Sequence, residues 1–141
     1  MTDERIKMEW LALETLPKAT FKFMGFNTDK PHLVIGQQTN SGKVYTIKID
    51  LSNNYPNKEP AAFIVSPKPL LTYSGESMLS ASHSMHTLTG DNGCVQVCHY
   101  GGSDWHPNVF LYQIVIKIRF WLEAYEHHLK RGEPLSNYLP G

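Results

Sequence analysis

The chain opens with a periodic pattern that predicts an amphipathic helix over residues 3–16. Four apolar residues recur at helical spacing and share one face: Ile6, Trp10, Leu13 and Leu16. Asp3 and Glu4 stand at the start of this segment, where the helix dipole favours acidic side chains, and Pro17 follows its end. We expect Trp10 to anchor this helix in the core.

The next part of the chain alternates between apolar and polar residues, with turn-forming residues at the breaks. Strands are expected over the ranges 21–26, 32–39, 44–50 and 61–65. The break at 40–42 reads Asn-Ser-Gly and is short enough for a hairpin. Four sequential strands with tight connections predict an antiparallel meander.

Residues 67–104 show no sustained period and are rich in Ser, Gly, Thr, His and Pro. We expect a long loop here, and a loop of this length inside a compact domain is usually functional. A helix is expected to open with Ser103 or Asp104 as its cap and Pro107 in its first turn, and to end at Gly132. Five residues share its apolar face: Val115, Ile118, Leu122, Tyr125 and Leu129.

The order of these elements predicts an α+β fold in one domain over residues 1–141. It consists of an N-terminal helix, a four-stranded antiparallel meander, a long loop and a C-terminal helix. The aromatic residues in and before the last helix are expected in the core: Trp105, Trp121 and Tyr125. His127 and His128 are expected on its solvated face.

Composition narrows the classes of partner. Of the 141 residues, 41% are apolar and 18% charged, which is typical of a globular protein. Thirteen basic residues balance thirteen acidic ones, so no net charge recruits nucleic acid or an anionic membrane. The longest apolar stretch, 109–120, is interrupted by Gln113, Lys117 and Arg119 and is too polar for a membrane span. The N-terminus has no signal-peptide pattern, so we expect a cytoplasmic protein.

Both cysteines of the chain, Cys94 and Cys98, lie in a region rich in histidine. Read for metal binding, they could form a zinc site with His83, His86, His99 and His106. The spacing fits no common zinc pattern, and we expect no metal and no cofactor. Read for catalysis, Cys98 is a candidate nucleophile, because an imidazolium at His99 would favour its thiolate. Cys94 follows the turn-forming Asn92-Gly93 and is expected to pack in the interior.

Three landmarks, in this order, resemble the ubiquitin-conjugating enzyme family. The run Tyr55-Pro56 with Pro60 resembles the family's Tyr-Pro…Pro element between the third and fourth strands. Val97-Cys98-His99 stands where the family has its active cysteine, and Trp105 matches the tryptophan that shortly precedes a helix. The segment 121–132 resembles the C-terminal helix of bacterial conjugating-type proteins encoded in antiphage operons. The family's His-Pro-Asn triplet lies upstream of the cysteine, where only Asn92 and His86 are candidates here.

The resemblance implies a ubiquitin-conjugating fold and a transferase of bacterial antiviral defence. Cys98 would accept a protein C-terminus as a thioester and pass it to an amine, and His99 or His86 would assist. Gly101 and Gly102 would give the approach to the thiol its backbone freedom. The donor would be a ubiquitin-like protein or a nucleotidyltransferase of the cyclic-GMP-AMP-synthase type, with an activating enzyme as a possible further partner. The alternative is a non-catalytic binding module on the same fold.

Overall fold

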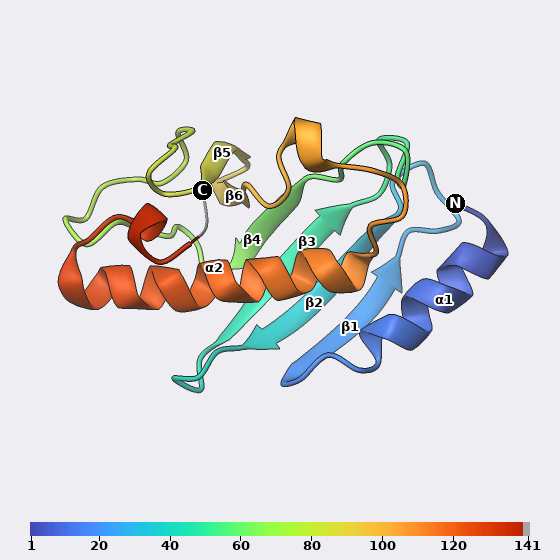
Figure 1. Cartoon of the computed structure of the whole chain (residues 1–141), viewed down its shortest axis with the longest axis horizontal. Coiled ribbons are helices and arrows are strands. Elements are labelled where there is room, and N and C mark those ends of the chain that lie inside the picture. Colours follow the sequence, from blue (N-terminus) through green and yellow to red (C-terminus); the bar gives the residue numbers. More distant parts are fainter. Residues whose placement is uncertain (140–141) are drawn as a thin grey trace.

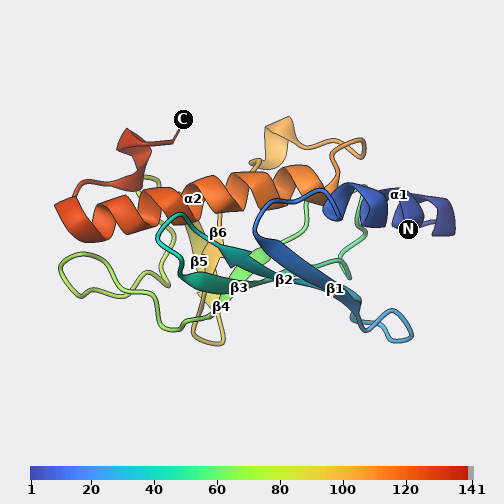
Figure 2. The ribbon, with the colours of Figure 1, turned by 90° about the horizontal axis from the view of Figure 1, so that it is seen from below.

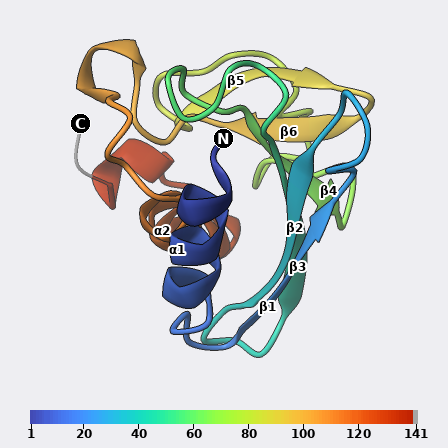
Figure 3. The same ribbon diagram turned by 90° about the vertical axis from the view of Figure 1, so that its right-hand side faces the viewer.

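Two layers make up the computed structural model, which describes residues 1–139: an antiparallel sheet, and two helices on one of its faces (Figure 1). Seen from below and from the side, both helices lie against the same face, and no helix of residues 1–139 lies against the other (Figures 2 and 3). The elements, in chain order, are α1 (Asp3–Leu13), β1 (Ala19–Met24), β2 (His32–Gln38), β3 (Val44–Asp50), β4 (Ala62–Ser66), β5 (Thr87–Asp91), β6 (Cys94–Val97), the 3₁₀ turn η1 (Gly102–Asp104), α2 (Leu111–Arg131) and the 3₁₀ turn η2 (Leu135–Asn137).

The sheet has six strands in the order β1-β2-β3-β4-β6-β5, and every neighbouring pair is antiparallel. Its first four strands follow the chain order, which confirms the predicted meander. The predicted count of four strands is wrong, because the hairpin β5–β6 lies within the segment expected to be a loop. Asn92 and Gly93 form its turn at positive φ, 51° and 75°, as a two-residue hairpin requires.

The second correction concerns the start of α2. It begins at Leu111, with Phe110 as its N-cap, and neither Ser103 nor Asp104 caps it. Asp104 instead ends the turn η1, and Trp105 after it is extended, with φ −80° and ψ 138°. Pro107 disfavours helical backbone at the residue before it, so the chain cannot turn into a helix at His106.

The core lies between the sheet and α2. On β2, β3 and β4 every second side chain is buried against the helix, as strand geometry dictates. Trp121 and Tyr125 are buried as expected, together with the predicted face of α2 up to Tyr125. Leu129, expected on that face, is 39% exposed.

In the next turn of α2 the buried residue is His128, and the prediction that it lies on the solvated face of the helix is wrong. His128 is 5% exposed. Its Nε2 accepts the Tyr73 backbone N–H at 2.9 Å, and its Nδ1 is 2.7 Å from the Glu133 carbonyl oxygen. Both ring nitrogens are therefore satisfied, which makes burial of the imidazole tolerable. His127 is exposed, as predicted.

Helix α1 also departs from its predicted packing. Trp10 is 45% exposed, so the prediction that it anchors the helix in the core is wrong. It lies at the edge of the sheet, edge-on to Phe21 at 5.0 Å and stacked on Phe23 at 5.9 Å. Leu13 and the carboxylate residue Glu9 are the buried residues of this helix. Among residues 1–139, neither helix combines the length and apolar character that crossing a membrane requires.

Candidate active site around Cys98

Cys98 is the first residue after β6, and a small hydrogen-bond network fixes its backbone. Its N–H donates to the His86 carbonyl oxygen at 3.0 Å. The Trp121 indole N–H on α2 donates to the same oxygen at 3.2 Å and to that of Met85 at 3.0 Å. The end of β6, the short loop that carries His86 and α2 are therefore joined by hydrogen bonds at Cys98.

Two adjoining clefts open beside Cys98, which is half-buried. The larger, of about 590 Å³, lies between the segments 81–88 and 98–104. The smaller, of about 240 Å³, has an apolar part of its lining, formed by Phe120, Trp121 and Leu139. Four residues line both clefts: His86, Cys98, His99 and Lys117. The structure thus brings the three predicted site residues together and adds a lysine.

Both ring nitrogens of His99 are engaged by the backbone, which does not suit the expected role of an imidazolium beside the Cys98 thiolate. Its Nε2 is 2.8 Å from the Pro60 carbonyl oxygen, and its Nδ1 accepts the Tyr100 backbone N–H at 3.0 Å. Burial lowers the pKa of His99 to about 4; the Pro60 hydrogen bond opposes this change and Lys117 adds to it. The expected imidazolium is therefore wrong: His99 is neutral near pH 7 and shapes the wall beside Cys98.

His86 lines both clefts and has a ring nitrogen without a hydrogen-bond partner. Ser82 and Thr87 exchange backbone hydrogen bonds of 3.1 and 3.0 Å, which closes the short loop that carries His83 and His86. His86 has a φ of 53°, in the left-handed region that few residues with a side chain adopt. Its Nε2 is buried and has no hydrogen-bond partner, and burial followed by the neighbouring His83 lowers the pKa of its ring. A neutral imidazole nitrogen can accept a proton or a hydrogen bond from a ligand.

The charges around the thiol come from two residues that the sequence analysis did not single out. Burial raises the pKa of the Cys98 thiol, the Glu59 carboxylate raises it further, and the Lys117 ammonium lowers it. Glu59 has a buried oxygen, Oε1, without a hydrogen-bond partner. Glu59 lies in the Tyr-Pro…Pro element and Lys117 interrupts the apolar run of α2, so each stood out in the sequence, but neither position indicated contact with Cys98.

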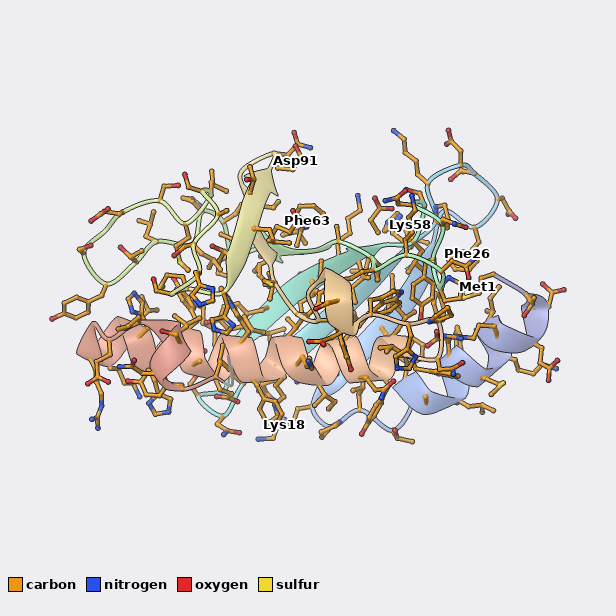
Figure 4. All side chains as sticks on the ribbon, turned by 45° about the horizontal axis from the view of Figure 1, so that its top comes forward. Met1, Lys18, Phe26, Lys58, Phe63 and Asp91 are labelled. Carbon is orange, nitrogen blue, oxygen red and sulfur yellow. The ribbon has the colours of Figure 1, made fainter. Side chains whose placement is uncertain are left out.

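Of the remaining candidates, His83, Gly101 and Asp104 line the larger cleft, whereas Cys94, Asn92 and His106 line neither cleft. Cys94 is 7% exposed, which confirms that it packs in the interior. Asp91, at the tip of the β5–β6 hairpin, points away from α2 (Figure 4), and Asn92 follows it in the turn. In the part of the chain that the structure describes, no three His, Cys, Asp or Glu side chains gather closely enough to hold a metal ion. The zinc interpretation therefore lacks a ligand set among those residues.

The chemistry of the site is that of a half-buried thiol with an open approach on two sides. A neutral imidazole nitrogen, an ammonium and a carboxylate surround it, a set suited to acyl transfer through sulfur. Comparisons of the chain with protein-family models, curated proteins and solved structures found no match. Function must therefore be inferred from the residues themselves.

Proposed function

We propose that this protein is a ubiquitin-conjugating-type transferase of bacterial antiviral defence, acting in the cytoplasm. Cys98 accepts the C-terminus of a donor protein as a thioester and passes it to an amine. The observation that carries the proposal is the position of Cys98 at the junction of two clefts. An extended donor tail can reach the sulfur from one side while an amine approaches from the other.

The landmarks of the resemblance also contact one another in space, which supports the family proposal. The Trp105 indole N–H donates to the Pro56 carbonyl oxygen at 3.0 Å. The Trp105 ring lies 6.1 Å from that of Tyr55 and 5.8 Å from that of Tyr100. The Tyr-Pro…Pro element between β3 and β4 thus packs against the segment that follows Cys98. Residues scattered over 50 positions in the sequence form one structural unit beside the thiol.

Each chemical step suits a thiol. In loading, the Cys98 thiolate attacks the activated carbonyl of the donor, a C–S bond forms and the bond to the earlier carrier breaks. In transfer, an amine nitrogen attacks the thioester, the C–N bond forms and the C–S bond breaks. The proton lost by nitrogen ends on the Cys98 sulfur. The donor is a ubiquitin-like protein or a nucleotidyltransferase of the cyclic-GMP-AMP-synthase type.

Covalent trapping tests this proposal. The protein is co-expressed with the products of its neighbouring genes and examined by intact mass spectrometry and non-reducing gel. We expect an adduct that a thiol reagent releases. Cys98→Ser should abolish it or convert it to a thiol-resistant oxyester, because a serine hydroxyl is almost wholly protonated near pH 7. Cys94→Ser is the matched control and should leave the adduct intact, because Cys94 is buried four residues away.

Two outcomes would reject the proposal. A thiol-sensitive adduct that survives Cys98→Ser and disappears with Cys94→Ser would show that Cys94, and not Cys98, is the nucleophile. Tight partner binding with no adduct under any condition would favour the non-catalytic binding module. The raised pKa of the Cys98 thiol favours that second function, because a protonated thiol is a poor nucleophile.

A further inference from the structure

A thiolate at Cys98, near the half-buried Glu59 carboxylate, would be stabilised by a positive charge close to the sulfur. Three histidines face the larger cleft together with Cys98: His83, His86 and His99. Burial lowers the pKa of both His86 and His99, which keeps their rings neutral near pH 7. The acidic groups nearby are Asp104, which lines the larger cleft, and Glu59. His83 lines only the larger cleft, whereas Lys117 on α2 lines both.

The ammonium of Lys117 is held in place although its side chain is exposed. Lys117 Nζ donates to the His99 carbonyl oxygen at 3.3 Å. It also stands over the Tyr100 ring, 3.8 Å from the centroid, where the face of the ring attracts a cation. These two contacts place the charge over the segment that directly follows Cys98. The side chain therefore reaches the site from α2 in a defined position.

We propose that Lys117 is the electrostatic partner of Cys98, stabilising the anionic sulfur and the oxyanion that forms on the acyl carbonyl. The second half of this inference rests on the proposed acyl transfer, whereas the first half concerns the thiol alone. In transfer, negative charge develops first on the carbonyl oxygen, when the amine nitrogen adds to carbon. It then passes to sulfur as the C–S bond breaks, and an ammonium in the clefts that Cys98 lines would counter the charge at both stages.

A direct test measures the ionisation of Cys98 without any donor protein. The rate of alkylation by iodoacetamide is recorded against pH, and peptide mapping assigns the modified cysteine. Lys117→Met removes the charge and keeps a long side chain, whereas Lys117→Arg keeps the charge. Lys130→Met is the matched control, since Lys130 is exposed on the same helix and lines neither cleft.

We expect Lys117→Met to raise the pH midpoint of Cys98 alkylation by about 0.5–1 pH unit, an exposed ammonium acting less strongly than a buried one. Lys117→Arg and Lys130→Met should leave the midpoint near that of the unmodified sequence. An unchanged midpoint in Lys117→Met would overturn the inference. So would an equal rise in Lys117→Arg, which would indicate lost packing, or in Lys130→Met, which would indicate an effect of net charge.

The acyl-transfer half is tested on the isolated adduct, discharged by free lysine. We expect discharge to slow about tenfold in Lys117→Met and to change little in Lys117→Arg. A shifted alkylation midpoint with no adduct from any donor would reject the proposed function and leave the role of Lys117 at the thiol standing. An adduct that forms and discharges normally in Lys117→Met, with an unmoved midpoint, would reject the role of Lys117 and leave the proposed function standing.

Discussion

Two clusters of charged and polar side chains lie along α2, one at its N-terminal end around Glu9 and one farther along around Cys98. At the first, Glu9 is fully buried and its carboxylate accepts from Arg5 Nε at 2.9 Å, from the Leu111 N–H at 2.9 Å and from the Tyr55 hydroxyl. At the second, Glu59 Oε1 and His86 Nε2 are buried without a partner.

The difference separates architecture from function. A buried carboxylate whose partners are all in place locks elements together, and Glu9 joins α1 to the first residue of α2. Arg5 extends this junction, donating to the Pro107 and Val109 carbonyl oxygens at 2.7 and 2.8 Å. Buried polar atoms without partners cost free energy, and groups of this kind gather at functional sites. Of the two, His86 lines both clefts beside Cys98. We therefore interpret the Glu9 cluster as structural and the Cys98 cluster as the site.

The largest effect expected from this comparison is on stability at the Glu9 cluster. Glu9→Ala removes the acceptor of Arg5 Nε, of the Tyr55 hydroxyl and of the Leu111 N–H. We expect the free energy of unfolding to fall by about 3–5 kcal/mol, measured by urea denaturation, because removing one partner strands the others in the interior.

A second Arg–Glu pair at the same i, i+4 spacing provides the control. Arg119 and Glu123 on α2 are 3.7 Å apart, and their side chains are 18% and 23% exposed, whereas Glu9 is fully buried. Glu123→Ala should cost about 1 kcal/mol or less. Equal costs for the two substitutions would remove the distinction between a sealed network and a surface pair.

The next effect, of similar order, concerns pH and belongs to the Cys98 cluster. The pKa of His99 falls from its ordinary 6.5 to about 4 in the folded protein. Between these values the unfolded chain binds a proton that the folded chain does not, so stability decreases as pH falls from about 6.5 to 4. His99 alone contributes a loss of roughly 3 kcal/mol. The Glu59 carboxyl, whose pKa burial raises, acts in the opposite direction.

A substitution separates the effect of His99 on the pH dependence of stability from that of the Glu59 carboxyl. His99→Gln places an amide N–H where Nε2 donates to Pro60 and removes the titration. The unfolding free energy of this variant should depend less on pH below 6.5 than that of the unmodified sequence, whereas His127→Gln at an exposed position should not alter the dependence. Parallel curves for all three proteins would show that His99 titrates normally.

The sequence predicted the sheet better than the site, for a physical reason. Alternation of apolar and polar residues is local, so β1 to β4 could be read from neighbouring positions. The hairpin β5–β6 was missed because its alternation is short and half polar, although Asn92-Gly93 marked its turn. Cys98 and its two histidines lie close together in the sequence and were found as a group. Lys117 and Glu59 reach them from other elements, and no local pattern predicts such a meeting.

The neutral state of His99 and the burial of Glu9 both depend on contacts with residues far away in the sequence. A histidine beside a cysteine suggests an ion pair. In the folded protein, however, His99 Nε2 hydrogen-bonds the carbonyl oxygen of Pro60, 39 positions away in the sequence. In the sequence, Glu9 lies outside the apolar face of α1 and would be taken for an acidic residue on the surface. Arg5, four residues earlier, was visible in the sequence, whereas Tyr55 and the first residue of α2 contact Glu9 only in the folded chain.

The smallest effect returns to the α1 end of the molecule, where Phe26 and Met1 also lie (Figure 4). Trp10 packs on Phe21 and Phe23 but remains 45% exposed, while Leu13 on the same helix is 1% exposed. A fully buried aromatic residue costs about 3–5 kcal/mol when cut to alanine, so we expect about 1–2 kcal/mol for Trp10→Ala. Leu13→Ala, at about 2–5 kcal/mol, should exceed it.

Urea denaturation of both variants beside Glu9→Ala decides what holds α1 to the rest of the protein. If the buried carboxylate and the Leu13 side chain dominate, Trp10→Ala stays the mildest of the three substitutions. A loss for Trp10→Ala as large as that for Glu9→Ala would show that aromatic packing at the sheet edge fixes the helix. The Glu9 network would then be a consequence of that packing. Its contrast with the unpartnered atoms around Cys98 would no longer distinguish a structural cluster from a functional one.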